Sequence, residues 1–339
     1  MKDRIHYADR LKGIAMLLVV MGHVAGFRMG VSNGMLTHFI QTCQMPLFMF
    51  MSGFLISPPP HWDSKKFIIK LAGLILPLFV FGLSYTFLSM NIHGYGDLLT
   101  QTINFLLAPA KNGYWYLMSL AVFYCFMPFF HLNRRGRIWI DMMIALSIYV
   151  ICFMGWKKTG LIGDVFCLLN CTDFFPFFIL GFFARKYKLL VTFISSERSF
   201  YINSNWLFSF SLLTYLILFN VSMPNYLLDT LSERFLIRFC AVVVFCTFIV
   251  KRERCQSKIE SALEYIGKHT LDVYVIHYFI IQYIGLAMFG QWTVSTGNIL
   301  ILIVVTLTVS VIVTYLSIWA GYILRESTFL KRFAFGDFK

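Results

Sequence analysis

Long apolar runs alternate with short polar segments along the whole chain. Runs of about 17–25 mostly apolar residues can cross a bilayer as helices. The sequence predicts ten such spans, at residues 10–29, 35–56, 67–89, 114–131, 137–156, 173–186, 205–222, 235–251, 269–289 and 298–322. The short loops leave no room for a soluble domain. The pattern therefore predicts an all-α polytopic membrane protein, with residues 1–339 forming one integral-membrane domain built as a bundle of about ten transmembrane helices.

An amphipathic segment, Leu98 to Leu107, is predicted to be a helix at the outer membrane interface.

Composition and charge agree with this class. Of the 339 residues 58% are hydrophobic and 13% are charged, whereas soluble domains are about half apolar and a quarter charged. The net charge of +13 could indicate nucleic-acid binding or a preference for one side of a membrane. The positions of the charges along the chain distinguish these two explanations. If the N-terminus is inside, most of the 29 Lys and Arg residues fall in cytoplasmic segments. This alternation follows the positive-inside rule and predicts that both termini are cytoplasmic and that nucleic acid is not a partner.

The eight cysteines are scattered and show no metal-binding pattern. There is no CxxC pair and no histidine at zinc spacing, so we predict packing residues and no metal site. Cys167 and Cys171 could form a disulfide if their loop is extracytoplasmic. The absence of P-loop, GxSxG, HExxH and Rossmann motifs argues against nucleotide hydrolysis.

The first span, DRLKGIAMLLVVMGHV (residues 9–24), carries a histidine deep in an apolar run. Lys12 and His23 are eleven residues apart, about three helical turns, so they share one face with Asp9. His23 is expected about 16 Å beyond Lys12 along the helix axis. An ionisable residue at that depth is a functional candidate. Alternatively, the charges anchor the interface and His23 hydrogen-bonds a neighbouring helix.

The second span also has a partly polar face. Its members follow one another at helical spacing: Gln41, Gln44, Phe48 and Ser52. The Ser52-Gly53 pair allows another backbone or a ligand to come close. A simple helix-packing face is the alternative.

The ninth span places a second histidine in the membrane. Thr270, Tyr274 and His277 lie on one side of the predicted helix, and His23 and His277 could share one cavity. His277 could equally be a structural hydrogen-bonding residue. Trp115, at the outer end of the fourth span, is explained by an aromatic belt at the membrane interface.

Five blocks of the sequence resemble, in order, the acyltransferase-3 family of membrane O-acyltransferases. They are KGIAMLLVVMGH (12–23), PLFMFMSGFLI (46–56), YWYLMSLAVFY (114–124), FPFFILGFFARK (175–186) and IGKHTLDVYVIH (266–277). Lys12 and His23 match the family's opening motif in its branch with Lys in place of Arg. The chain departs from the family at Gly73, where an Arg is usual after the basic residues Lys65, Lys66 and Lys70.

The resemblance implies an O-acyltransferase of the bacterial cytoplasmic (inner) membrane. It would move an acyl group, usually acetyl, from cytoplasmic acyl-CoA to a hydroxyl of a surface or secreted glycan. Such a hydroxyl needs a general base, for which we choose His23, with His277 assisting through substrate orientation or oxyanion stabilisation. Inside-facing cations are candidates to hold the CoA phosphates: Lys12, Lys66, Lys70, Arg134, Arg135 and Arg137. Substrate-contacting or supporting roles fall to Asp9, Gln44, Ser52, Trp115 and Tyr274. Lys12 is alternatively an ion-pair partner of Asp9.

Two other functions compete with this interpretation. A transporter or flippase for a glycan or lipid-linked precursor would line a path with the polar stripe, but internal repeats and broken helices in corresponding positions are not evident. A glycan polymerase would require a large extracytoplasmic loop with catalytic Arg residues, whereas the outer loops are short and poor in basic residues.

Overall fold

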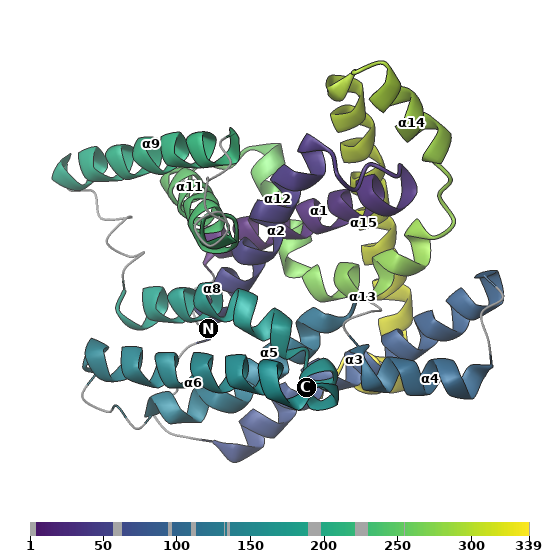
Figure 1. The fold of residues 1–339 in the computed structure, drawn as a ribbon, viewed down its shortest axis with the longest axis horizontal. Helices are drawn as coiled ribbons and strands as arrows, with labels where there is room; N and C mark the ends of the chain where they lie inside the picture. The colour runs from purple at the N-terminus through teal and green to yellow at the C-terminus, as the bar shows by residue number, and fades with distance from the viewer. Residues whose placement is uncertain are drawn as a thin grey trace. The chain divides into compact units, whose positions relative to one another are not determined.

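The computed structural model describes residues 5–56, 63–93, 97–109, 113–131, 133, 136–188, 198–220, 230–253 and 255–338. In this part of the chain the regular structure is helical and contains no strand (Figure 1). The chain divides into two compact units. The first consists of Met1–Ser57 and Phe177–Ile318, and the second of Pro58–Pro176 and Trp319–Lys339.

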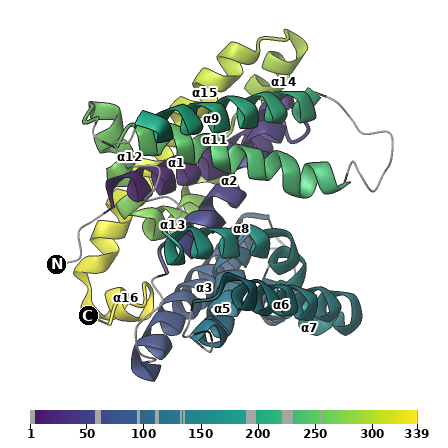
Figure 2. The same ribbon diagram turned by 90° about the vertical axis from the view of Figure 1, so that its left-hand side faces the viewer.

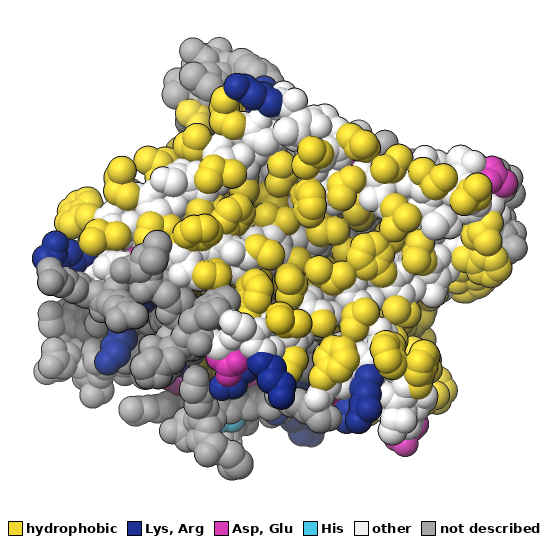
Figure 3. Space-filling view, turned by 90° about the horizontal axis from the view of Figure 1, so that it is seen from below, with side chains coloured by type: hydrophobic (Ala, Val, Ile, Leu, Met, Phe, Trp, Pro, Cys, Tyr) yellow, Lys and Arg dark blue, Asp and Glu magenta, His cyan; other side chains and the backbone are white. Residues whose placement is uncertain are grey.

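Five helices in the described residues are long and apolar enough to cross a membrane. They are His6–Arg28, Ser64–Met90, Ile138–Thr159, Leu168–Lys186 and Ile299–Glu326. Many large hydrophobic side chains are exposed, and Figure 3 shows a face on which such side chains predominate. Lipid is the solvent that stabilises such a surface. The chain is thus an all-α, multi-pass membrane protein. The ten-span count and the cytoplasmic termini stay predictions.

The first unit contains both predicted histidine-bearing helices. Its elements are α1 (His6–His23), η1 (Val24–Arg28), α2 (Met35–Phe54), the end of α8 (Leu168–Lys186), α9 (Arg198–Asn220), η5 (Ser232–Leu236), α11 (Ile237–Lys251), α12 (Lys258–Lys268), α13 (Thr270–Ile281), α14 (Ala287–Ser295) and most of α15 (Ile299–Glu326). Helix α1 packs against α2 and α12, and α9 runs beside α11 (Figures 1 and 2).

Glycines bring α1 and α12 into backbone contact. A Cβ added at Gly13 would lie 2.1 Å from the carbonyl oxygen of Leu263, and one at Gly267 would lie 1.8 Å from that of Asp9. Both distances are far below van der Waals contact. Only hydrogen fits at these positions, and the small residues therefore set how closely the two helices approach.

A second pair of glycines joins α2 to α8. A Cβ at Gly53 would lie 1.8 Å from the carbonyl oxygen of Phe178, and one at Gly181 would lie 1.9 Å from that of Phe50. The prediction that the Ser52-Gly53 pair admits another backbone is confirmed.

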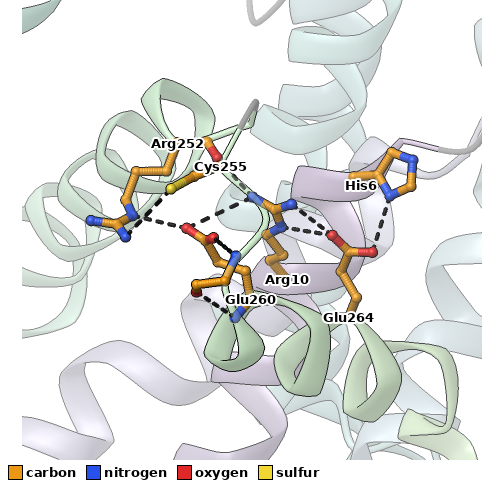
Figure 4. Close-up of polar contacts among 7 residues, drawn as sticks. His6, Arg10, Arg252, Cys255, Glu260 and Glu264 are labelled. Atoms are coloured by element: carbon orange, nitrogen blue, oxygen red, sulfur yellow. Dashed lines mark hydrogen bonds and ion pairs between the residues drawn. The ribbon is translucent and has the colours of Figure 1, made fainter.

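A cluster of charged side chains ties the start of α1 to α12 (Figure 4). Arg10, only 2% exposed, donates from Nε to Oε1 of Glu264 over 2.8 Å and from Nη1 to the carbonyl oxygen of Arg252 over 2.7 Å. His6 Nδ1 lies 3.0 Å from the other oxygen of Glu264. A buried guanidinium is stable only when its donors are paired in this way.

Helix α12 begins with a capping box, in which Ser257 is the N-cap residue and Glu260 the third residue of the helix. The Ser257 side chain accepts from the backbone N–H of Glu260, and the Glu260 carboxylate accepts from the backbone N–H of Ser257. Arg252 donates from Nε to the same carboxylate over 2.9 Å. The backbone hydrogen bond and the guanidinium lower the pKa of Glu260 to about 2. The sequence analysis did not identify this helix, although its Ser-x-x-Glu start is a recognisable signal.

The second unit holds most of the remaining helices. They are α3 (Ser64–His93), α4 (Leu98–Leu107), α5 (Trp115–Phe126), η3 (Met127–His131), α6 (Ile138–Thr159), α7 (Leu161–Val165), the start of α8, the end of α15 and α16 (Thr328–Phe333). The helix predicted from Leu98 to Leu107 is present as α4, with Asp97 capping it by accepting from the backbone N–H of Thr100.

Gly336, near the C-terminus, packs against Gly73, the position at which the family resemblance predicts an Arg. A Cβ at Gly73 would lie 3.5 Å from the carbonyl oxygen of Gly336, and one at Gly336 would lie 2.4 Å from Cα of Gly73. Gly336 has φ of +62°, which favours glycine. Phe335 packs on Phe81 of α3, with ring centroids 5.2 Å apart.

Some predicted elements differ from the structure. The span 269–289 is interrupted, because α13 ends at Ile281 and α14 begins at Ala287. Gly285 lies in this break, and glycine costs a helix about 1 kcal/mol relative to alanine. Cys167 and Cys171 are free cysteines, so the disulfide considered for them is not formed.

Candidate active site

The structure brings together, within the first unit, the two histidines that the sequence predicts in membrane spans. His23 is the last residue of α1 and His277 lies in α13. Their rings stack with centroids 5.3 Å apart and an interplanar angle of 27°. The hydroxyl of Tyr278 lies 3.0 Å from Nε2 of His23. The three side chains form one polar cluster, hereafter the histidine cluster.

The hydrogen bond of His277 defines which of its nitrogens is free. Nδ1 lies 2.8 Å from the carbonyl oxygen of Val273. A carbonyl can only accept, so Nδ1 carries the hydrogen and Nε2 of the neutral ring has its lone pair free. His277 is fully buried, and its Nε2 has no hydrogen-bond partner among the described residues. Such an atom in a buried site is suited to accept a hydrogen bond from a bound molecule.

The helix changes its winding directly after His23. Residues Val24–Arg28 form a π-helical turn, a feature that is frequent at functional sites. In this turn Phe27 lies parallel to the His23 ring, with centroids 5.2 Å apart and an interplanar angle of 8°. The His23 ring therefore contacts Phe27 of this turn as well as His277 and Tyr278 of α13.

Helix α2 adds an amide beside His23. A Cβ at Gly22 would lie 2.9 Å from Oε1 of Gln44, so this amide lies directly against the residue that precedes His23. Oε1 is buried and has no hydrogen-bond partner in the described part of the chain. The Ser52 hydroxyl, two turns further along α2, donates to the carbonyl oxygen of Phe48 over 2.8 Å. Gln44 thus adjoins the histidine cluster, whereas Ser52 hydrogen-bonds within its own helix.

Tyr278 is the member of the cluster that the sequence analysis missed. Tyr274, which was predicted, has its ring centroid 6.3 Å from that of His277, whereas Tyr278 is 4.3 Å from it. A signal was available, because Tyr278 follows Tyr274 by four residues and so lies on the same helical face.

The family comparison identifies the chemistry of this chain. A family model described as an acyltransferase domain matches residues 5–315. The chain belongs to the acyltransferase-3 family. This acyltransferase is therefore a membrane enzyme, and the match decides against the transporter, flippase and polymerase interpretations. Comparisons with curated proteins and with solved structures gave no match.

In this acyltransferase the two ends of α1 have separate polar partners. Lys12 Nζ lies 2.9 Å from Oδ1 of Asp9, three residues earlier on the helix. Of the two roles considered for Lys12, the ion pair with Asp9 is therefore present. The Lys12 side chain is 19% exposed, so part of it remains accessible.

The predicted phosphate-binding lysines lie on α3 in the second unit. Lys66 is exposed and pairs with Asp63, with Nζ 3.1 Å from Oδ2. Lys70, also exposed, lies over the Tyr124 ring at 5.3 Å from its centroid.

Of the predicted arginines, the structure describes Arg137, which directly precedes α6. Arg134 and Arg135 lie outside the described residues. Arg137 is exposed, and its backbone N–H and carbonyl are both bound by the buried side chain of Asn133. Asn133 in turn donates to Asp141 over 2.8 Å, which fixes the start of α6.

Trp115 lies at the beginning of α5. Its ring stacks on that of Phe174, with centroids 5.1 Å apart and an interplanar angle of 20°. The contact is apolar, and it gives Trp115 a packing role within the second unit.

Proposed function

We propose that this acyltransferase moves an acyl group, usually acetyl, from cytoplasmic acyl-CoA to a hydroxyl of a surface or secreted glycan, with His23 as the general base. The observation that carries the proposal is the hydrogen bond between His23 Nε2 and the Tyr278 hydroxyl beside a second buried imidazole. A sugar hydroxyl is a weak nucleophile, and a neutral imidazole is suited to remove its proton at neutral pH. The enzyme would work in the bacterial inner membrane.

The proton would reach His23 through Tyr278. An imidazole nitrogen has one lone pair, and the Tyr278 hydroxyl already occupies the position in front of Nε2. As the acceptor oxygen attacks the thioester carbon, its proton passes to the Tyr278 oxygen while the Tyr278 proton passes to His23. The carbon–sulfur bond then breaks, and the imidazolium of His23 returns the proton to the CoA thiolate. The products are the sugar ester and CoA.

His277 would orient the acceptor. Its free Nε2 accepts hydrogen bonds but cannot donate one in the neutral ring, so orientation of a hydroxyl fits this geometry better than oxyanion stabilisation. The amide of Gln44, with its unpartnered Oε1 beside Gly22, would assist.

Cations would hold the CoA. The exposed Lys66, Lys70 and Arg137, together with Arg134, Arg135 and Lys12, are the candidates for its phosphates. Their positive charges are opposite to those of the CoA phosphates.

The test uses the purified protein in lipid nanodiscs with acetyl-CoA. Release of CoA is followed with and without glycan acceptors, and the acylated product is identified by mass spectrometry. His23→Ala is expected to lower the acceptor-dependent rate by at least about 100-fold. His6→Ala on the same helix, whose side chain is 56% exposed, is the control. A variant at position 23 with the wild-type rate would refute the role of this base.

A further inference from the structure

A polar pocket outside the histidine cluster lies where α2 begins and α9 ends. The cavity has a volume of about 560 Å³, within the range of small-molecule sites. The residues that line it include Ser32, Asn33, His38, Gln41, Phe219 and Asn220. All of them belong to the first unit, which also carries the histidine cluster.

The lining is polar but almost uncharged. Among the described residues that line the pocket, none is Lys or Arg. His38 is the only ionisable one of these lining residues, and its Nε2 lies 3.9 Å from the carboxylate of Glu233. A phosphate-rich molecule such as CoA requires cations. The pocket is therefore suited to a neutral polar ligand and not to the acyl donor.

The side chains of the pocket match the hydrogen-bonding needs of a sugar. Asn and Gln amides each carry donors and an acceptor, as sugar hydroxyls do. In the described part of the chain, the side chains of Ser32, Asn33 and Gln41 make no hydrogen bond with other residues. They are therefore available to a ligand.

An aromatic platform adjoins these amides. Phe219 lies with its ring centroid 4.8 Å from that of His38 and 5.6 Å from that of Tyr215. Tyr215 is anchored by Thr42, whose hydroxyl lies 2.8 Å from the Tyr215 oxygen. The electron-rich face of a fixed aromatic ring attracts the polarised C–H groups of a sugar.

The polar side chains of α2 continue beyond the pocket to the surroundings of His23. His38, Gln41 and Gln44 follow one another at three-residue spacing, and Gln41 stands about 4.5 Å from Gln44 along the helix axis. Gln44 in turn lies against Gly22, next to His23. Helix α2 therefore joins the pocket to the surroundings of His23, with Gln41 and Gln44 about 60° apart around the helix axis.

We infer that this pocket binds the acceptor carbohydrate of the transfer reaction, with Asn33 and Gln41 contacting its hydroxyls and Phe219 packing on its ring. The inference rests on the proposed function and adds the site of the second substrate. The sugar hydroxyl to be acylated would extend past Gln41 and Gln44 toward His23.

The experiment measures binding and transfer separately. Wild-type protein in nanodiscs is mixed with soluble oligosaccharides of glucose, galactose, mannose, rhamnose and N-acetylglucosamine, and binding is followed by saturation-transfer NMR. Phe219→Ala and Gln41→Ala are compared with Phe210→Ala, which alters an exposed residue of α9 outside the pocket. Gln41 is exposed, so its variant is expected to fold even if Phe219→Ala does not.

The expected result is a loss of carbohydrate affinity in both pocket variants. The Kd and the KM for the oligosaccharide should rise at least about 10-fold, while the KM for acetyl-CoA stays unchanged. Binding that is lost in the variants without any acylation by the wild type would support the pocket and refute the proposed function. Acylation with wild-type KM in both variants would support the function and refute the pocket. A wild type that neither binds nor acylates any of these sugars would overturn the pocket assignment.

Discussion

The hydroxyl of Tyr278 lies 3.0 Å from Nε2 of His23, although the two residues are 255 positions apart in the chain. This contact requires that the C-terminal end of α1 and the second half of α13 lie side by side. Helix α12, which immediately precedes α13, is fixed on α1 by the glycine contacts and by the ion pairs of Arg10. The position of the proposed base thus depends on packing about three helical turns away from it.

Tyr278→Phe is expected to lower kcat while it leaves the KM for acetyl-CoA unchanged. The substitution keeps the aromatic ring and removes only the hydroxyl that would relay the proton. The acceptor can then approach Nε2 directly, so we expect a loss of about 10-fold, smaller than the loss in His23→Ala. Steady-state kinetics with a saturating acceptor measures it.

The matched control is Tyr283→Phe, which removes a hydroxyl from a tyrosine that is 69% exposed just beyond α13. A Tyr278→Phe enzyme as fast as this control would show that the relay is not used.

Gly13→Ala is expected to destabilise the protein by about 1–3 kcal/mol, because the new methyl group collides with the backbone of Leu263. Gly26 provides the control, since a Cβ there meets nothing within 4 Å. Gly26→Ala should be neutral or more stable by up to about 1 kcal/mol. Unfolding of both variants in nanodiscs or mild detergent measures the difference. Equal stability of the two variants would contradict the close α1–α12 contact.

Glu260→Gln is expected to lower the melting temperature in a pH-dependent manner. The folded-state pKa of Glu260, about 2, is below its ordinary value of 4.5. The ionised carboxylate therefore stabilises the fold above pH 4.5, and this contribution is lost as the pH falls through about 2. Glutamine can still cap the helix, so the substitution removes mainly the charge.

Melting temperatures of wild type and Glu260→Gln should thus differ most at pH 7 and converge toward pH 2. Glu326→Gln, at the exposed end of α15, should show no such convergence. A difference that is independent of pH would argue against the ionic role of Glu260.

Lys70→Gln tests the proposed phosphate contact. The KM for acetyl-CoA should rise about 10-fold, the size of effect expected when a hydrogen bond to a charged group is lost. The KM for acetyl-pantetheine, which has no phosphate, should not change.

Lys157→Gln is the control for Lys70→Gln, because Lys157 is also exposed and also lies over an aromatic ring. If Lys70→Gln raised the KM for acetyl-CoA and the KM for acetyl-pantetheine equally, Lys70 would have a structural role and would not recognise phosphate.

Properties that depend on local spacing could be predicted from the sequence. The apolar runs predict membrane helices, because hydropathy and length act within each segment. Helical periodicity predicts that Asp9 and Lys12 share a face, and the structure pairs them. The helix at Leu98–Leu107 and the close backbone contact at Gly53 follow from equally local signals. Helix α12 also had a local signal in its capping box, which the analysis overlooked.

Contacts between distant segments required the tertiary structure. The hydropathy pattern places His23 and His277 in apolar helices, but it allows either to be an isolated structural residue. Their stacking, the hydrogen bond from Tyr278 and the pocket between α2 and α9 arise from the packing of helices that are far apart in the chain. Such packing depends on which side chains interlock and on where glycines permit backbone contact. The spacing within one helix specifies which residues share a face, and only the packed helices specify which faces meet.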